Sequence, residues 1–146
     1  MRDEAFEASY QRLFGSGIQA APSSDALIHD FYQRFFAASP AVAHAFRNTD
    51  MNRQVSALRS SLHDLVNFHL TGILGHRLRR VAERHRHMDF PVELYDLWLD
   101  CIVAAAADRD PQADGFTAYH WRLALLPGVT YMKLWHGSER SPLDGP

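Results

Sequence analysis

The sequence predicts an all-α fold of six to seven obliquely packed helices, and three observations favour it. No stretch alternates apolar and polar residues for long, so strands are not expected. Apolar residues instead recur every three or four positions along nearly the whole chain, and short links rich in Pro, Gly and capping residues separate these stretches. No heptad pattern persists across the links, which argues against an elongated coiled coil.

Four of the predicted helices lie in the first half of the chain. We expect them near Glu4–Phe14, Asp25–Ala38, Pro40–Phe46 and Met51–His69. Residues on one helical face support three of them: Phe6, Tyr10 and Leu13 in the first, Phe31 and Phe35 in the second, and Leu58, Leu62 and Leu65 in the fourth. Gly15 follows the end of the first helix, Pro40 suits the first turn of the third, and Asp50 is a capping residue before the fourth.

The second half contains three more predicted helices, near Arg77–His87, Val92–Ala107 and Gln112–Trp135. Gly72 and Gly75 separate the first of these from the preceding helix, and Pro91 opens the second. Pro127 is expected to kink or break the last helix, because proline has no N–H and its ring clashes with the preceding turn.

Composition indicates one domain, residues 1–136, followed by a polar and flexible tail, residues 137–146. Hydrophobic residues make up 47% of the 146-residue chain, enough for a core, and a net charge of −2 gives no indication of a nucleic-acid or membrane partner. The single Cys101 lies in an apolar run, as expected of a reduced thiol. The polar N-terminus and the lack of a long apolar segment favour a cytoplasmic protein.

His85 is the strongest candidate for a metal ligand among nine scattered histidines. Val81 and Ala82 precede it by four and three residues, so the three share one helix face. Imidazole is the commonest protein metal ligand, and a single histidine holds many haem irons. The alternative is a half-exposed histidine in a basic segment. His87 is a weaker candidate, because charged residues occupy the equivalent positions before it.

Several segments occur in a specific order around His85: FYQRFFAASPAVAHAF, RQVSALRSSL, LRRVAERH, PVELY and the tryptophan of YHWRLALL. In order and spacing they resemble the globin family, and more closely the bacterial single-domain globins and the globin domain of flavohaemoglobins. The resemblance covers about Tyr10–Trp135. It implies a globin-like fold that encloses haem b.

The resemblance also implies a role for individual residues. The implied iron ligand is His85, the implied distal residues facing a bound gas are Tyr32 and Gln54, and the implied cofactor-binding residues are Phe46, Leu58, Arg84 and Tyr95. Arg53 and Val55 remain alternatives to Gln54, because the step from Phe46 is about two residues shorter than in the bacterial relatives. An apolar cage of Phe35, Phe36, Phe46, Leu58, Leu62 and Val81 would exclude water, and the Tyr32 and Gln54 donors would stabilise bound O2.

Three functions remain open at this point. The first is reversible binding of O2, NO or CO at a pentacoordinate-type iron, for oxygen transport or scavenging. The second is a nitric oxide dioxygenase served by a separate reductase, and the third is a haem-based gas sensor that acts through a partner protein. Fifteen residues beyond Trp121, where the flavohaemoglobin relatives have a carboxylate, this chain has His136, which weakens the enzymatic alternative. The oligomeric state, monomer or homodimer, is open.

Overall fold

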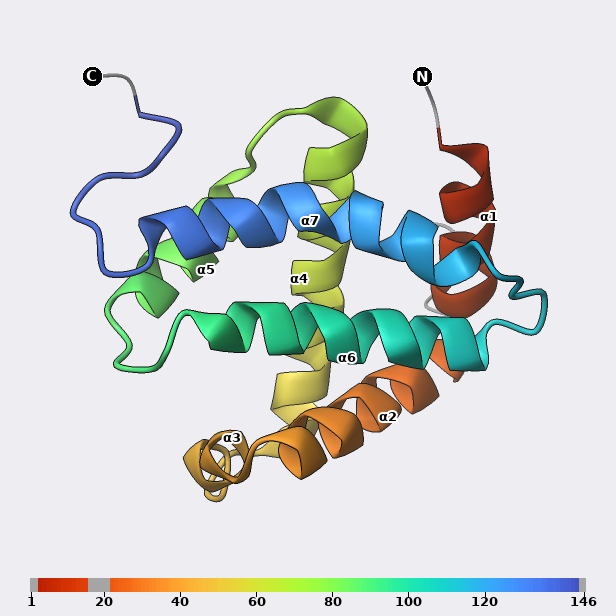
Figure 1. Ribbon diagram of the computed structural model, residues 1–146, viewed down its shortest axis with the longest axis horizontal. Coiled ribbons are helices and arrows are strands. Elements are labelled where there is room, and N and C mark those ends of the chain that lie inside the picture. Colours follow the sequence, from red (N-terminus) through yellow and green to blue (C-terminus); the bar gives the residue numbers. More distant parts are fainter. Residues whose placement is uncertain (1–2, 16–21, 145–146) are drawn as a thin grey trace.

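The structure is a computed structural model that describes residues 3–15 and 22–144. Within these residues the chain forms seven α-helices and no strand, as the sequence predicts (Figure 1). In chain order the helices are α1 (Glu4–Phe14), α2 (Pro22–Ala38), α3 (Pro40–Ala45), α4 (Met51–Thr71), α5 (His76–Arg86), α6 (Glu93–Arg109) and α7 (Thr117–Trp135).

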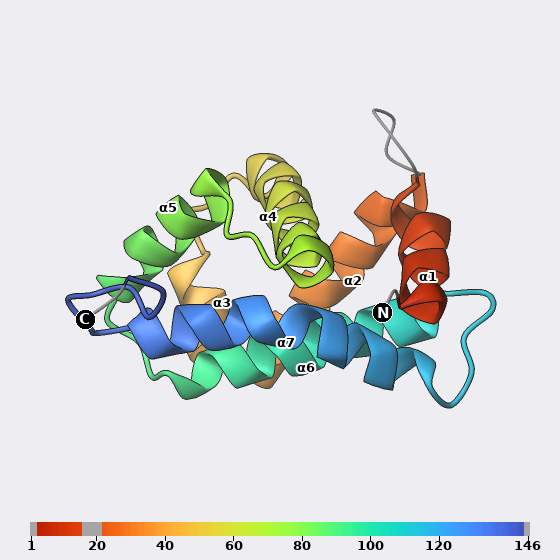
Figure 2. The same cartoon turned by 90° about the horizontal axis from the view of Figure 1, so that it is seen from above.

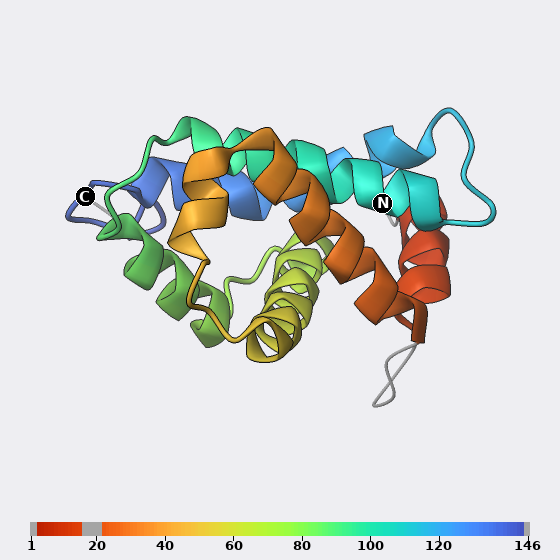
Figure 3. The ribbon, with the colours of Figure 1, turned by 90° about the horizontal axis from the view of Figure 1, so that it is seen from below.

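The helices cross one another obliquely rather than lying parallel in a bundle. Helices α6 and α7 lie side by side on one face of the molecule, and α4 crosses behind α7 at a steep angle (Figure 1). Seen from above, α1 lies at one end of this pair and α5 at the other (Figure 2). Seen from below, α2 crosses α6 and leads into α3 (Figure 3). The predicted oblique packing is therefore confirmed.

Most helix boundaries agree with the expected ranges, but the start of α7 does not. The expected helix began at Gln112, whereas α7 begins at Thr117. The Asp114 carboxylate accepts a hydrogen bond from the backbone N–H of Phe116 (2.8 Å), and the Asp114 N–H donates to the Thr117 hydroxyl (2.9 Å). These bonds compete with helix formation before Thr117. Helix α7 then continues through Pro127 without a break, and a kink at this residue, the other expected outcome, stays a prediction.

Two other helices are longer than expected. Helix α2 begins at Pro22, three residues before the predicted start at Asp25, and α4 continues to Thr71. Gly72 ends α4 with a positive φ of 70°, and its N–H donates to the Phe68 carbonyl (2.8 Å). Glycine adopts this left-handed conformation without steric cost, which explains a helix end at this residue.

The core is centred on α7, whose buried face packs against α1, α4 and α6. Trp121 is fully buried and its ring lies 5.0 Å from that of Phe6, in an edge-to-face arrangement. At the crossing with α4, a Cβ on Gly128 would lie 2.2 Å from Cδ2 of Leu65. The lack of a side chain at Gly128 therefore allows α4 to approach α7 closely, and this positions the helix that carries Gln54.

The segment after α7 returns along α5. The Asp144 carboxylate accepts two hydrogen bonds from Arg79 (3.1 and 3.0 Å), and the hydroxyls of Tyr131 and Ser141 are 2.7 Å apart. Residues 145–146 lie outside the described range. The flexibility expected for residues 137–146 stays a prediction.

Candidate functional site

Tyr32 and Gln54, the two implied distal residues, are joined by a hydrogen bond between α2 and α4. The Gln54 Nε2 atom donates to the Tyr32 hydroxyl oxygen at 2.9 Å. Burial raises the pKa of Tyr32 to about 12, so its hydroxyl stays protonated at neutral pH. No residue in the described ranges accepts a bond from that hydroxyl. If the amide were turned, Tyr32 would donate to Gln54 and the amide N–H would be free, so either orientation leaves a donor.

Phe46 and Leu58 lie beside this pair. The Phe46 ring centroid is 5.8 Å from that of Tyr32, and the Leu58 side chain is buried one helical turn after Gln54. Phe46 itself is only half-buried. Of the alternatives to Gln54, Arg53 is exposed and Val55 is buried in the core. Gln54 is therefore the residue of these three that contacts Tyr32.

His85 lies near the end of α5, and among the described residues only one of its two ring nitrogens has a hydrogen-bond partner. Its Nδ1 atom is 2.8 Å from the Val81 carbonyl oxygen. A carbonyl can only accept, so Nδ1 carries the proton and Nε2 carries the lone pair. Burial lowers the pKa of His85, with the Val81 bond opposing this shift. The ring is therefore neutral at pH 7, and Nε2 has no partner among the described residues.

Tyr95 and His136 form a second polar pair that connects the start of α6 with the end of α7. The Tyr95 hydroxyl is 3.1 Å from Nδ1 of His136, and Nε2 of His136 is 3.1 Å from the Phe90 carbonyl oxygen. The carbonyl requires a proton on Nε2, so in a neutral ring Nδ1 accepts from the Tyr95 hydroxyl. Burial raises the pKa of Tyr95 to about 12, which keeps this donor protonated.

The sequence pointed to the position of His136 but not to its role. The spacing from Trp121 identified it as the place where relatives have a carboxylate, whereas the structure shows it bonded to Tyr95 and to the link that follows His85. Arg84 and His87 are both exposed. The structure therefore brings Tyr32, Gln54 and Phe46 into one group and Tyr95 with His136 into another, while the hydrogen bond of His85 is to its own helix.

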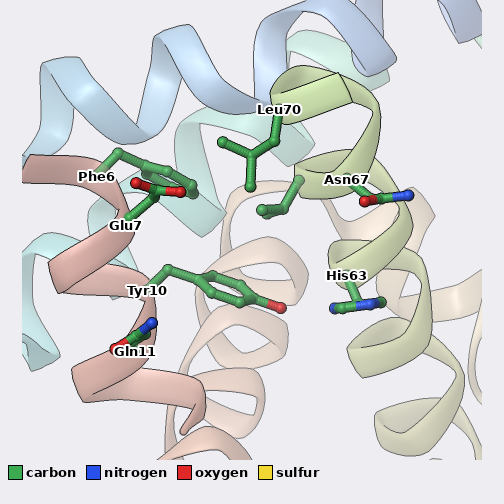
Figure 4. Close-up of a pocket in the computed structure, with 8 residues that line it drawn as sticks. Phe6, Glu7, Tyr10, Gln11, His63, Asn67 and Leu70 are labelled. Atoms are coloured by element: carbon green, nitrogen blue, oxygen red, sulfur yellow. The ribbon is translucent and has the colours of Figure 1, made fainter. Parts of the chain in front are cut away.

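A separate small cavity lies between α1 and α4 (Figure 4). Its volume is about 130 Å³, below the roughly 300–1,000 Å³ of a typical small-molecule pocket. The residues that line it are Phe6, Glu7, Tyr10, Gln11, His63, Val66, Asn67 and Leu70. None of the predicted site residues is among them, so this cavity is not the site to which the sequence points.

Residues 3–15 and 22–144 contain neither a cluster of metal-binding side chains nor a membrane-spanning helix. No group of three or more His, Cys, Asp or Glu side chains is arranged to hold a metal ion. No helix there is long and apolar enough to cross a membrane.

No family model and no curated protein matches the chain. Among solved structures, it is similar to protein PA3967 of Pseudomonas aeruginosa PAO1, which is described as structurally highly homologous to a human hemoglobin. The two share 33% sequence identity with a TM-score of 0.78, and the match covers 92% of this chain and 98% of the other. Because identity at this level extends over nearly the full length of both proteins, the chain belongs to the globin-like family.

Proposed function

We propose that the protein binds haem b through Nε2 of His85 and uses it to bind O2 or another diatomic gas reversibly. The observation that carries the proposal is the state of His85: a neutral ring whose Nδ1 is bonded to Val81 and whose Nε2 has no partner in the described residues. A bond at Nδ1 fixes the tautomer and the ring orientation that a metal ligand requires. When bound, haem supplies an iron centre that can take up diatomic gases.

The apolar side chains of the region fit a flat, largely apolar cofactor. Of the six predicted cage residues, Phe35, Leu58 and Leu62 are buried in the core, whereas Phe36, Phe46 and Val81 are only half-buried. Other half-buried apolar residues come from the link between α4 and α5, the link after α5 and the start of α6: Leu74, Phe90, Val92, Leu94 and Leu97. The core packs against one side of these residues, so a porphyrin would cover apolar surface that the chain leaves partly open.

Tyr32 and Gln54 would supply the polar contact to a bound gas molecule. The donor left free by the Tyr32–Gln54 hydrogen bond would bind a gas molecule that carries partial negative charge. A hydrogen bond to a charged acceptor stabilises by roughly 1.5–3 kcal/mol, on the order of 10–100-fold in affinity. Tyr32 and Gln54 would therefore slow gas release, and exposed Arg84 is available to pair with a propionate.

The Tyr95–His136 pair favours reversible gas binding over oxidative chemistry. A carboxylate near a ligating histidine raises its basicity. In this chain both ring nitrogens of His136 instead lie within hydrogen-bond distance of the Tyr95 hydroxyl and the Phe90 carbonyl. We therefore place gas binding ahead of nitric oxide dioxygenation. Nitrate formation by reduced protein supplied with a separate reductase would reverse this order, and a partner bound in only one ligation state would favour the sensor.

The test is the visible spectrum of the full chain supplied with hemin, in the ferric, ferrous and CO-bound states. We expect stoichiometric uptake in the wild type, loss in His85→Ala, and recovery when imidazole is added to His85→Gly. His87→Ala is the matched control, because it removes an exposed imidazole two residues away. A wild-type protein that takes up no haem, or a spectrum unchanged by His85→Ala, would contradict the proposal.

A further inference from the structure

The small cavity between α1 and α4 combines a buried apolar floor with a polar edge (Figure 4). Phe6 is fully buried and Val66 is 4% exposed, so these two side chains form the floor, and Leu70 lies beside them. Gln11 and His63 are exposed and border the cavity where it meets solvent. Such a cavity suits a ligand that is apolar at one end and polar at the other.

The volume of the cavity matches a single ring. It is about 130 Å³. A cavity of roughly 150 Å³ with apolar walls holds one benzene molecule. Nucleotides and most cofactors need pockets several times larger, of roughly 300–1,000 Å³. A ligand of this cavity is therefore limited to one ring with a short substituent.

Aromatic side chains of α1 border the cavity. The ring of Tyr10 is stacked on that of Phe14, with centroids 4.9 Å apart and 16° between the planes. The Phe6 ring lies 5.9 Å from that of Tyr10 and 5.0 Å from that of Trp121. The cavity thus lies at the edge of a cluster of aromatic rings. Because such rings attract one another in offset and edge-to-face geometries, an aromatic ligand is favoured over a saturated ligand of similar size.

Tyr10 also supplies a polar group without a partner. Its hydroxyl is directed across the cavity towards α4, on the side of His63 (Figure 4). Within residues 3–15 and 22–144, neither side chain forms a hydrogen bond. Burial, with a smaller contribution from the Asp64 carboxylate, raises the pKa of Tyr10 to about 12, so the hydroxyl stays protonated at neutral pH. A ligand hydroxyl can both donate to and accept from such groups.

The charges around the cavity favour a neutral ligand. The described residues that line it include the carboxylate of Glu7 but no lysine or arginine. An anionic ligand would therefore meet a like charge without a compensating cation. The Asp64 carboxylate, which acts on Tyr10, is already paired with Arg77 at 2.8 Å, so it offers little attraction to a cationic ligand.

We propose that the cavity between α1 and α4 binds a small neutral molecule with one aromatic ring and one hydroxyl group. The ring lies against Phe6 and Val66, and the hydroxyl bonds to Tyr10. The site is independent of the proposed haem site, because none of the implied haem-binding or distal residues lines it.

Benzyl alcohol is the probe that tests the proposal, titrated into the ¹⁵N-labelled full chain and followed through the amide resonances. We expect saturable shifts confined to residues 6–11 and 63–70, with a dissociation constant on the order of 1 mM for a ligand of this size. Shifts that do not saturate, or that are centred on other residues, would overturn the proposal.

Three comparison ligands test the chemical class. Cyclohexylmethanol lacks the aromatic ring, toluene lacks the hydroxyl, and benzoate carries a negative charge. We expect each to bind about 3-fold or more weakly than benzyl alcohol, because each loses one of the three favourable features of the site. Equal or tighter binding of any of them, or of the benzylammonium cation, would show that the ligand class is wrong.

Leu70→Trp tests the location of the site. Leu70 is 44% exposed and lines the cavity, so a larger side chain at this position can occupy the space without disturbing the core. We expect binding of benzyl alcohol to weaken by about 10-fold or more. The matched control is Ile73→Trp, because Ile73 is 69% exposed and is not among the lining residues. Circular dichroism checks that both variants keep their helices, and equal binding by the two variants would contradict the proposed location.

Tyr10→Phe tests the polar contact, since it keeps the ring and removes only the hydroxyl. We expect the preference for benzyl alcohol over toluene to fall by about 2–10-fold, while the affinity for toluene stays unchanged. A general disturbance of the cavity would instead weaken both ligands. A preference that stays at the wild-type value would exclude Tyr10 as the partner of the ligand hydroxyl and overturn this part of the proposal.

Discussion

Two polar clusters of this protein are built in opposite ways. The first, which we call the α1 junction, ties α1 to the end of α6 and to α7. Its centre is Asp110, whose carboxylate accepts bonds from Ser9 (2.6 Å) and from Nε and Nη2 of Arg12 (2.7 and 2.8 Å). The indole N–H of Trp121 donates to the Ser9 hydroxyl (2.9 Å). Each of these four side chains is thus hydrogen-bonded to another member of the cluster.

The candidate site differs in that two of its functional atoms have no partner among the described residues. Nε2 of His85 and one donor of the Tyr32–Gln54 pair are free. Gln54 and His85 are only half-buried, so the protein does not fully enclose these side chains. We infer from this difference that the α1 junction stabilises the fold, whereas the candidate site keeps hydrogen-bonding and metal-ligating atoms available for a ligand. Substitutions in the two regions should therefore affect different measurements.

The largest stability effect is expected for Asp110→Ala. The side chain of Asp110 is fully buried, and its loss would leave Ser9 and Arg12 without their acceptor. We expect the free energy of unfolding to fall by about 3 kcal/mol, measured by urea denaturation. Asp144→Ala is the matched control, because Asp144 also binds an arginine through two bonds but is exposed. Equal effects of both substitutions would remove the distinction drawn for the α1 junction.

The pH dependence of stability sharpens the same contrast. The Arg12 guanidinium lowers the pKa of Asp110 from 3.8 to about 2. A lowered carboxyl pKa stabilises the fold above the unfolded value and loses this contribution as pH falls towards 2. It amounts to about 2 kcal/mol. We expect the difference in unfolding free energy between the wild type and Asp110→Asn to shrink between about pH 5 and pH 2. A difference independent of pH would exclude this linkage.

A smaller loss of stability is expected for His136→Phe, which disrupts the Tyr95–His136 pair. The substitution leaves the buried Tyr95 hydroxyl without its acceptor and frees the Phe90 carbonyl. We expect a loss of about 1–2 kcal/mol in the free energy of unfolding. A double-mutant cycle with Tyr95→Phe measures how much of this comes from the pair. Strictly additive effects would show that Tyr95 and His136 do not interact.

The smallest effect on stability is expected for Tyr32→Phe, a substitution in the candidate site. It removes one side-chain hydrogen bond, so the free energy of unfolding should change by about 1 kcal/mol or less. Dissociation of O2 from the haem-loaded protein should accelerate at least several-fold, as stopped-flow absorbance would record. Tyr119→Phe is the control, because Tyr119 is an exposed tyrosine on α7. An unchanged dissociation rate in Tyr32→Phe would remove Tyr32 from the site.

Local sequence patterns predicted the helices, whereas features that depend on side-chain or tertiary contacts were not predicted. The spacing of apolar residues, together with proline, glycine and capping signals, predicted the helices, because a helical face is defined by residues three or four apart. The start of α7 was wrong because the side-chain bonds of Asp114 and Thr117 do not enter that pattern. The pattern of apolar residues gives no role to Asp110. The burial of this residue depends on residues of α1, 98 and 101 positions away in the chain.

By itself the sequence determined that this chain is helical, where its apolar faces lie, and that His85 follows such a face, since these properties depend on neighbours within one or two turns. Only the tertiary structure decided that Gln54 rather than Val55 meets Tyr32, that His136 bonds to Tyr95, and that Asp110 is buried against α1. Each of these depends on the angle and distance at which two helices cross. Those are set by the packing of the whole core, including the close approach of α4 and α7 at Gly128.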